Sequence, residues 1–304
     1  MARPNKQVLE ERENFLQSIR ECADSPSKFS EIFLGHKLFP YNKRYVDCKD
    51  RFIVYRSGRQ VGKTMSTAVK ACHFALFAPL MLSSVKNECV IVIAAPTQNQ
   101  ATIMFNRIRD LITDNDFLNG FVVRNTQTEL WVRFLDNTGV SKLIVRATGE
   151  TGVSLRGYSP HCIIADECSF IKTDILRAFL PSGLATKARI WLTSTPFSKA
   201  GYFYEACQNA KPTNPEGMWT EFHVKSTENP LVQEDPAFLE EIKRLTKEER
   251  HDQKLAMLDH KIEMKNEMKS ILNAEQFEKW EASKKSPRKM KGKRGGKDSH
   301  NRRR

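Results

Sequence analysis

Short apolar runs alternate along most of the chain with longer segments in which apolar residues recur every three or four positions. The short runs predict buried strands, and the longer segments predict amphipathic helices. Strands are expected at residues 52–56, 89–95, 121–124, 129–135, 142–147, 161–166, 188–194 and 220–225. Such alternation is typical of an α/β fold with a mostly parallel sheet and helices on both faces.

The same pattern divides the chain into four parts. Residues 1–35 are expected to form a helical lead-in, and residues 36–234 the α/β domain. A helical extension is predicted over 235–282, followed by a disordered basic tail over 283–304. Within the α/β domain, the strands on either side of residues 125–128 suit a hairpin at the edge of the sheet.

The positive charge is concentrated at one end of the chain. The formal net charge is +13, and residues 283–304 contain eleven Lys or Arg and a single acid, Asp298. A segment of this composition cannot bury enough apolar surface to fold, and it binds polyanions by releasing counterions. A nucleic-acid partner and a purely solubilising tail both fit this composition.

Composition also indicates the compartment. The longest apolar stretch, residues 71–82, contains His73 and Pro79 and is too short to cross a bilayer. Residues 1–29 are polar and show no secretion signal. The seven cysteines are odd in number and form no C-x-x-C pair, which supports neither a zinc site nor a disulfide framework. A cytoplasmic protein without a membrane partner is therefore expected.

The segment after the first predicted strand has the pattern of a phosphate-binding loop. It lies between a β-like run at 52–55 and a helix-like run at 65–77, the context that such a loop needs. Gly62 lets the backbone bend around an anion, Lys63 is placed to reach the β/γ-phosphates, and Thr64 to ligate Mg²⁺. An ordinary loop that ends in Gly-Lys-Thr is the alternative for this segment alone. The predicted phosphate-binding residues are Ser57, Gly58, Arg59, Gln60, Val61, Gly62, Lys63 and Thr64.

A second motif follows about a hundred residues later, where an apolar run ends in Asp166 and Glu167. In α/β sheets ligands bind beyond the carboxyl ends of the strands. Asp166 is therefore expected to hold Mg²⁺, and Glu167 to act as the general base that polarises the attacking water. An acidic turn at the end of a strand is the simpler alternative, and the phosphate loop upstream argues against it.

A third strand-like run ends in the hydroxyl triplet Thr193, Ser194 and Thr195, followed by Pro196. Three hydroxyls at a strand tip can sense a γ-phosphate. A capped turn before a proline explains the same residues without any function.

These segments together resemble the ATPase domain of the large terminase subunit of tailed bacteriophages. The resemblance rests on residues 57–64, with serine first and Arg-Gln inside the loop, on Ala165-Asp166-Glu167, and on residues 193–196, in this order. It covers roughly residues 30–245. It implies a P-loop NTPase fold of the RecA/ASCE-like kind and a motor that uses ATP with Mg²⁺ to drive double-stranded DNA into a capsid.

The resemblance also implies partners and further site residues. The partners would be double-stranded DNA, the portal protein and the small terminase subunit, with the chain in a homo-oligomeric ring on the procapsid in the host cytoplasm. Arg59 would be a catalytic or coupling arginine. The triplet of Thr193, Ser194 and Thr195 would couple hydrolysis to motion.

Two further assignments follow from the same resemblance. The adenine would contact Pro40, Tyr41 and Asn42, with Asn42 standing where a glutamine is expected. Arg156, in a Gly-rich segment before the acidic strand, would stabilise charge on a neighbouring subunit's phosphate, as an arginine finger does. A surface arginine without such a role is the alternative.

The end of the chain departs from this family. Large terminases carry a nuclease domain after the ATPase, whereas residues after 236 are helix-forming, so endonuclease activity is not expected. Residues 245–250 and 271–277 weakly resemble the Leu-Thr-x-x-Gln helices of small bacterial periplasmic chaperone-like proteins, which suggests a fusion; a linker or helices packed on the ATPase would be alternatives. Two other functions stay open: a helicase-like P-loop nucleic-acid ATPase, or a truncated or fused chain that binds ATP without productive turnover.

Overall fold

The computed structural model describes residues 6–237, 239–241 and 243–244. The chain divides into two compact units, residues 1–234 and 235–304. Most of the predicted helical extension and all of the predicted basic tail lie outside the described residues, and the four-part division of the chain stays a prediction. The fold and site below belong to the first unit.

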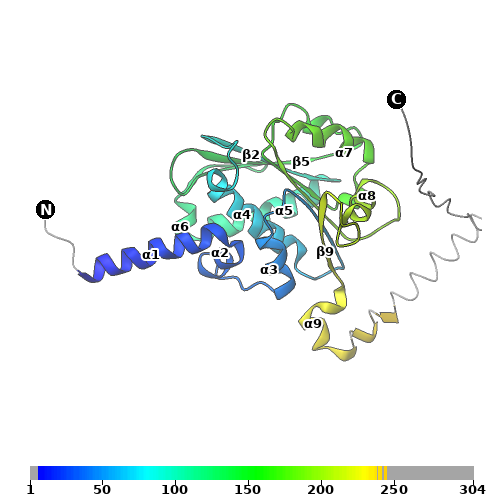
Figure 1. The fold of residues 1–304 in the computed structure, drawn as a ribbon, viewed down its shortest axis with the longest axis horizontal. Helices are drawn as coiled ribbons and strands as arrows, with labels where there is room; N and C mark the ends of the chain where they lie inside the picture. The colour runs from blue at the N-terminus through cyan, green and yellow to red at the C-terminus, as the bar shows by residue number, and fades with distance from the viewer. Residues whose placement is uncertain (1–5, 238, 242, 245–304) are drawn as a thin grey trace, which may run out of the picture. The chain divides into compact units, whose positions relative to one another are not determined.

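A nine-stranded sheet in the order β3-β4-β5-β2-β6-β7-β1-β9-β8 forms the centre of this unit (Figure 1). Adjacent strands are parallel except in the β3–β4 and β4–β5 pairs. The strands are β1 (Phe52–Ser57), β2 (Glu88–Ala95), β3 (Val122–Asn125), β4 (Glu129–Arg133), β5 (Val140–Ala147), β6 (Cys162–Asp166), β7 (Arg189–Ser194), β8 (Ala210–Lys211) and β9 (Trp219–Val224).

The eight predicted strands are all present, and the mostly parallel α/β sheet is confirmed. The expected hairpin, β3 with β4, lies at one edge of the sheet. Strand β8 was missed because its two residues are too few to show a period of two.

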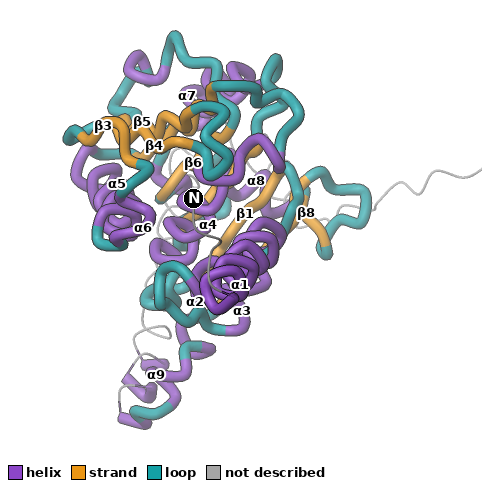
Figure 2. The backbone as a smooth tube through the Cα atoms, turned by 90° about the vertical axis from the view of Figure 1, so that its left-hand side faces the viewer, coloured by secondary structure: helices purple, strands orange, loops and turns teal. Residues whose placement is uncertain are grey.

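Helices cover both faces of the sheet. They are α1 (Lys6–Asp24), α2 (Pro26–Ile32), α3 (Pro40–Asp47), α4 (Lys63–Met81), α5 (Gln98–Thr113), α6 (Asp116–Asn119), α7 (Thr173–Phe179), α8 (Tyr202–Gln208) and α9 (Pro230–Gln233). Figure 1 shows α7 on the side of the sheet opposite to α4, and Figure 2 shows the same layers from the side. Four short 3₁₀ turns lie among the described residues, η1 (Val153–Leu155), η2 (Cys168–Phe170), η3 (Leu180–Gly183) and η4 (Ser226–Glu228).

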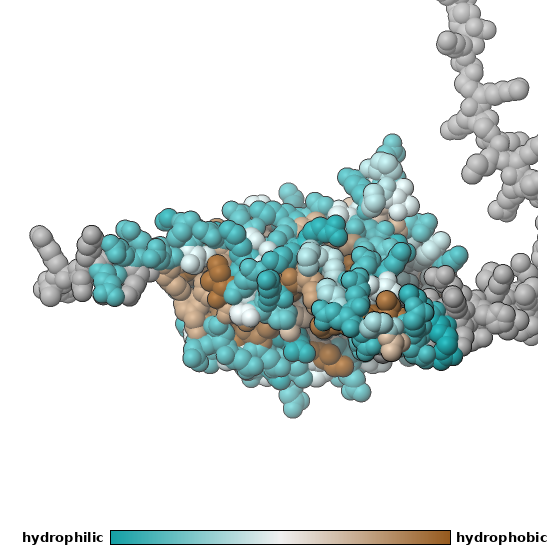
Figure 3. All heavy atoms as spheres, turned by 90° about the horizontal axis from the view of Figure 1, so that it is seen from below, coloured by the Kyte–Doolittle hydropathy of each residue, from teal (hydrophilic) through white to brown (hydrophobic). Residues whose placement is uncertain are grey.

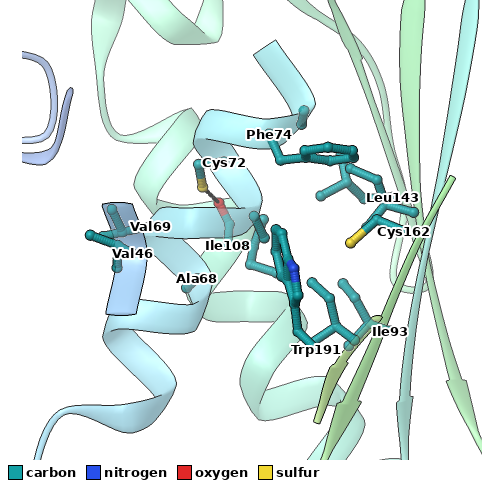
Figure 4. Packing of buried hydrophobic residues seen from close by; sticks show 14 of the residues in the cluster. Val46, Ala68, Val69, Cys72, Phe74, Ile93, Ile108, Leu143, Cys162 and Trp191 are labelled. Carbon is teal, nitrogen blue, oxygen red and sulfur yellow. Dashed lines mark hydrogen bonds between the residues drawn. The ribbon is translucent and has the colours of Figure 1, made fainter. Parts of the chain in front are cut away.

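Two hydrophobic clusters fill the space between the sheet and these helix layers. Because side chains alternate along a strand, Ile53 and Tyr55 face one cluster and Val54 faces the other. The first cluster includes Trp191 of β7 and Phe74 of α4, whose rings meet edge to face at 5.7 Å (Figure 4). The second is covered by α7 and α8. The apolar runs of the central strands are therefore buried on both faces, as parallel strands usually are.

The face of the first unit drawn in Figure 3 is mainly polar. In the view of Figure 3 hydrophobic residues are scattered among hydrophilic ones. Among the helices that the structure describes, none has the length and apolar character needed to cross a membrane.

Candidate active site

The predicted phosphate loop connects the end of β1 to the start of α4. Lys63 and Thr64 are the first two residues of α4, so their backbone lies at the positive end of a helix of 19 residues. Gly62 has φ 78° and Gln60 has φ 59°, both in the left-handed region. The hydroxyl of Ser57 is buried and finds no hydrogen-bond partner among the described residues. This strand–loop–helix geometry is the one that the sequence predicts.

The acidic strand β6 lies close to this loop in space. Only β7 separates β6 from β1, and the three strands are parallel. Their carboxyl ends therefore share one edge of the sheet, where Asp166 is paired in register with Thr193. Glu167 follows with φ 47°, a left-handed conformation that is unusual for a residue with a Cβ.

An ion pair joins the two motifs. The Lys63 Nζ lies 2.7 Å from Glu167 Oε1, and the Lys63 and Glu167 side chains are 8% and 25% exposed. Residues that are about a hundred positions apart thus form an ion pair at the tip of the sheet. This places the end of the phosphate loop within bonding distance of the acidic pair.

The hydroxyl triplet completes the same cluster. Thr193 Oγ1 donates to Asp166 Oδ1 at 2.6 Å. Ser194 Oγ lies 3.3 Å from Glu167 Oε2 and 3.1 Å from the Thr195 carbonyl, so its single proton is shared between two acceptors. Two of the three hydroxyls therefore touch the acidic pair.

Ser169 holds the turn after Glu167 against the triplet. Its backbone N–H donates to Ser194 Oγ at 3.2 Å, and its hydroxyl donates to the Thr195 carbonyl at 3.1 Å. The rings of Phe170 and Phe197, which continue the two loops, lie 4.7 Å apart. Sequence reasoning missed Ser169, because a serine two positions after an acidic pair carries no motif of its own.

Asp166, one of the two residues expected to hold Mg²⁺, has the burial and chemistry that suit a divalent cation. Asp166 is 5% exposed, and burial raises its pKa, while the Lys63 ammonium and the Thr193 hydrogen bond act in the other direction. A buried carboxylate of this kind is stabilised by a cation. Among the described residues, neither this site nor any other gathers three or more His, Cys, Asp or Glu side chains that could hold a metal ion. Mg²⁺ needs no such group, since it takes most of its ligands from water and phosphate.

The two predicted arginines are both exposed. Arg59 lies in the phosphate loop. Arg156 follows the 3₁₀ turn η1 and lines a cavity of about 640 Å³ between the β5–β6 connection and α7, together with Gly152, Leu155 and Ile175. Their catalytic roles stay predictions.

The predicted adenine segment forms the first turn of α3. Pro40 is exposed, whereas Tyr41 and Asn42 are buried. The Asn42 amide contacts the phosphate loop itself, since its Nδ2 donates to the Val61 carbonyl at 2.9 Å. An adenine contact by these three residues stays a prediction.

A second asparagine near the phosphate loop was missed. Asn229 Nδ2 donates to the Gln60 carbonyl at 2.6 Å, and Ser226 packs against Gly58. An asparagine before a proline, here Pro230, favours a turn or a helix cap. That signal predicts the local cap and not the contact with a loop so far away in the sequence.

Comparison with known families decides the class of protein. Residues 54–279 match the family model of the terminase large subunit, T4likevirus-type, N-terminal, which is more than half of the chain. The chain belongs to the large terminase family. The matched residues include the phosphate loop, the acidic pair and the hydroxyl triplet, so the family resemblance predicted from these motifs is confirmed.

Solved structures agree with the fold of this terminase ATPase domain. The ATPase domain of the large terminase of Thermus phage P74-26 is 22% identical with a TM-score of 0.57, over 69% of this chain and 90% of that one. The large terminase of bacteriophage HK97 is 18% identical with a TM-score of 0.53, over 66% of this chain and 43% of that one. These likenesses confirm the P-loop NTPase fold. A comparison with curated proteins found no match.

Proposed function

We propose that this chain is the Mg²⁺-dependent ATPase motor of a viral DNA-packaging terminase, which couples ATP hydrolysis to translocation of double-stranded DNA into a capsid. The observation that carries the proposal is the 2.7 Å contact between Lys63 and Glu167. It joins a phosphate loop to an acidic pair at the carboxyl edge of a parallel sheet, where α/β proteins bind nucleotides.

Each residue of the cluster has a task in this chemistry. The N–H groups at the start of α4 face the phosphates, with Lys63 on the β- and γ-phosphates. Thr64 and Asp166 would hold Mg²⁺, which when bound neutralises charge on the phosphates. Glu167 accepts a proton from the attacking water, and Arg59 with a neighbour's Arg156 stabilises charge that develops on the transferred group.

The ion pair also suggests how nucleotide binding readies the base. Lys63 holds Glu167 Oε1, and a triphosphate competes for the same ammonium. Transfer of Lys63 to the phosphates leaves Oε1 free to accept a proton, while Ser194 keeps its contact with Oε2. The triplet thus couples the state of the base to the strand β7 and, through it, to motion of the domain.

Family membership supports the partners. Double-stranded DNA, a portal protein and a small terminase subunit are the proposed partners, and the chain would act as a homo-oligomeric ring on the procapsid in the host cytoplasm. The exposed position of Arg156 is compatible with action on a neighbouring subunit's nucleotide.

The test is ATP hydrolysis by the purified chain with Mg²⁺, with and without linear duplex DNA, over a range of protein concentrations. Specific activity should rise with protein concentration, because a neighbour supplies Arg156, and DNA should stimulate it. Hydrolysis that is independent of both concentration and DNA would contradict a ring motor. Absence of ATP binding would contradict the whole assignment.

A further inference from the structure

Two buried asparagines bond consecutive carbonyl groups of the phosphate loop. Asn42, on α3, donates Nδ2 to the Val61 carbonyl at 2.9 Å, and Asn229, just before α9, donates Nδ2 to the Gln60 carbonyl at 2.6 Å. The two side chains are 2% and 4% exposed. The loop is therefore held at adjacent peptide groups by side chains from distant parts of the chain.

The loop carbonyls fix the orientation of both side-chain amides. A backbone carbonyl can only accept, so it must face the NH₂ end of the asparagine. The opposite end of Asn42, Oδ1, accepts from the Tyr55 hydroxyl at 2.6 Å. The Oδ1 of Asn229 accepts from the backbone N–H of Leu231 at 3.0 Å. In each asparagine Oδ1 accepts a hydrogen bond from a residue outside the loop, and Nδ2 donates one to a carbonyl of the loop.

The position of a carbonyl decides where the next N–H points. In a trans peptide the C=O of one residue and the N–H of the next point in opposite directions. Bonds to the Gln60 and Val61 carbonyls therefore turn the N–H groups of Val61 and Gly62 away from the two asparagines. Successive N–H groups on one side of a loop form an anion-binding concavity.

The backbone of the loop needs such support. Gln60 has φ 59° although it carries a side chain, and such a conformation persists where the surroundings impose it. The neighbouring turn also packs tightly, because a Cβ at Gly58 would lie 2.2 Å from Ser226 Oγ. A Cβ at Gly62 would lie 2.8 Å from Asn42 Nδ2.

We infer that Asn42 and Asn229 are positioning residues for phosphate binding, which orient the Val61 and Gly62 N–H groups toward the phosphates of the nucleotide. The inference rests on the proposed ATPase function. It differs from an adenine contact by Asn42, because the two asparagines act through the loop backbone and touch no base.

Asparagine-to-aspartate substitutions separate the two tasks of each side chain. N42D and N229D keep the Oδ1 acceptor for Tyr55 or Leu231 and remove the donor to the loop. The neutral variant N229A removes the donor without adding charge. N115D is a matched control, because Asn115 uses the same division: its Oδ1 accepts from the Leu118 N–H at 2.9 Å and its Nδ2 donates to the Phe33 carbonyl at 2.5 Å.

The measurement is the affinity for MgATP by calorimetry and the inhibition constant of inorganic tripolyphosphate, which has phosphates and no base. Loss of one hydrogen bond of this kind corresponds to roughly a threefold to tenfold change. N42D, N229D and N229A should each weaken the binding of ATP and of tripolyphosphate. Within each variant the two affinities should fall by the same factor, and N115D should change neither affinity. The melting temperature of each variant should stay well above the temperature of the binding measurement, which shows that a loss of affinity is not a loss of folding.

The outcomes are distinct. Variants that bind both ligands as the unmodified chain does would overturn the inference and leave the proposed function intact. Weaker ATP binding by N42D with an unchanged tripolyphosphate constant would also overturn it, in favour of an adenine contact. An effect of N229D that N229A lacks would assign the loss to charge and overturn the role of the amide. Failure of the unmodified chain to bind MgATP would count against the proposed function itself.

Discussion

Glu167 is held at both carboxylate oxygens, by Lys63 on Oε1 and by Ser194 on Oε2. The acid and the lysine therefore share one ion pair although the roles proposed for them differ. Lys63 acts in nucleotide binding, and Glu167 acts on the water. Substitutions at the two positions should separate these roles.

Lys63→Ala should abolish nucleotide binding, since it removes the ammonium that contacts the β/γ-phosphates. Glu167→Gln should keep nucleotide binding and lower turnover by about 10²-fold or more, because only the base is removed. Nucleotide binding by fluorescence and ATP turnover measure the two effects. Glu205→Gln, which breaks the Arg177–Glu205 pair on the surface, is the control and should leave both unchanged. Equal loss of nucleotide binding in the Lys63 and Glu167 variants would refute the assigned roles.

At the scale of elements, buried polar side chains of α4 hold the N-terminal helices to the α/β core. Lys70 Nζ donates to the carbonyls of Val46 and Cys48 at 2.7 and 2.6 Å, at the end of α3. His73 Nε2 lies 2.7 Å from the Cys22 carbonyl of α1, and its ring stacks on Phe77. Since a carbonyl only accepts, Nε2 carries the proton in the neutral ring.

Acid should weaken this packing through His73. Burial lowers its pKa to about 4 from an ordinary value of 6.5, and Nδ1 finds no hydrogen-bond partner among the described residues. Between pH 6.5 and 4 the unfolded chain binds a proton that the folded chain does not. The contribution of His73 to the free energy of unfolding is therefore fully present above pH 6.5 and should fall by about 3 kcal/mol toward pH 4. Urea unfolding at several pH values measures this.

His73→Gln isolates the effect, because glutamine keeps a neutral donor and does not titrate. The difference in unfolding free energy between the unmodified chain and this variant should shrink or reverse between pH 7 and pH 4. A difference that does not change with pH would show that His73 contributes nothing to acid sensitivity.

At the scale of the whole molecule, most of the net charge and the residues of the candidate active site lie in different parts of the sequence. Residues 1–282 carry a small share of the net charge of +13, and residues 283–304, outside the described residues, carry the rest. The cluster around Lys63 and Asp166 lies in the first compact unit. Polyanion binding and basal hydrolysis should therefore respond to different deletions.

Removal of residues 283–304 should weaken binding to duplex DNA and flatten its dependence on salt, because fewer counterions are released. Basal ATP hydrolysis should stay unchanged. Binding by fluorescence anisotropy at several salt concentrations and hydrolysis without DNA measure the two effects. A variant of full length in which the eleven basic residues are glutamine is the control for length. Collapse of basal hydrolysis on deletion would contradict a purely electrostatic role.

Local pattern was enough to predict the strands and the motif residues. A period of two or a continuous apolar run is carried by neighbouring residues, so the eight strands and the flanks of the phosphate loop could be read directly. The residue types of 57–64 and of the Asp166–Glu167 pair likewise carry their chemistry in a short segment. Among the strands that the structure describes, only β8 was missed, because two residues show no period.

The order of the strands and the contacts between distant segments depended on the fold. Nothing in the local pattern states that β7 lies between β1 and β6, which is what lets Thr193 and Ser194 reach the acidic pair. The bonds from Asn42 and Asn229 join the phosphate loop to residues 19 and 169 positions away in the sequence. Such contacts form when separate elements pack on one sheet. The residues next to each partner in the sequence therefore do not predict them. The chemical groups of the candidate site could thus be predicted from the sequence, whereas the contacts that orient them are decided by tertiary packing.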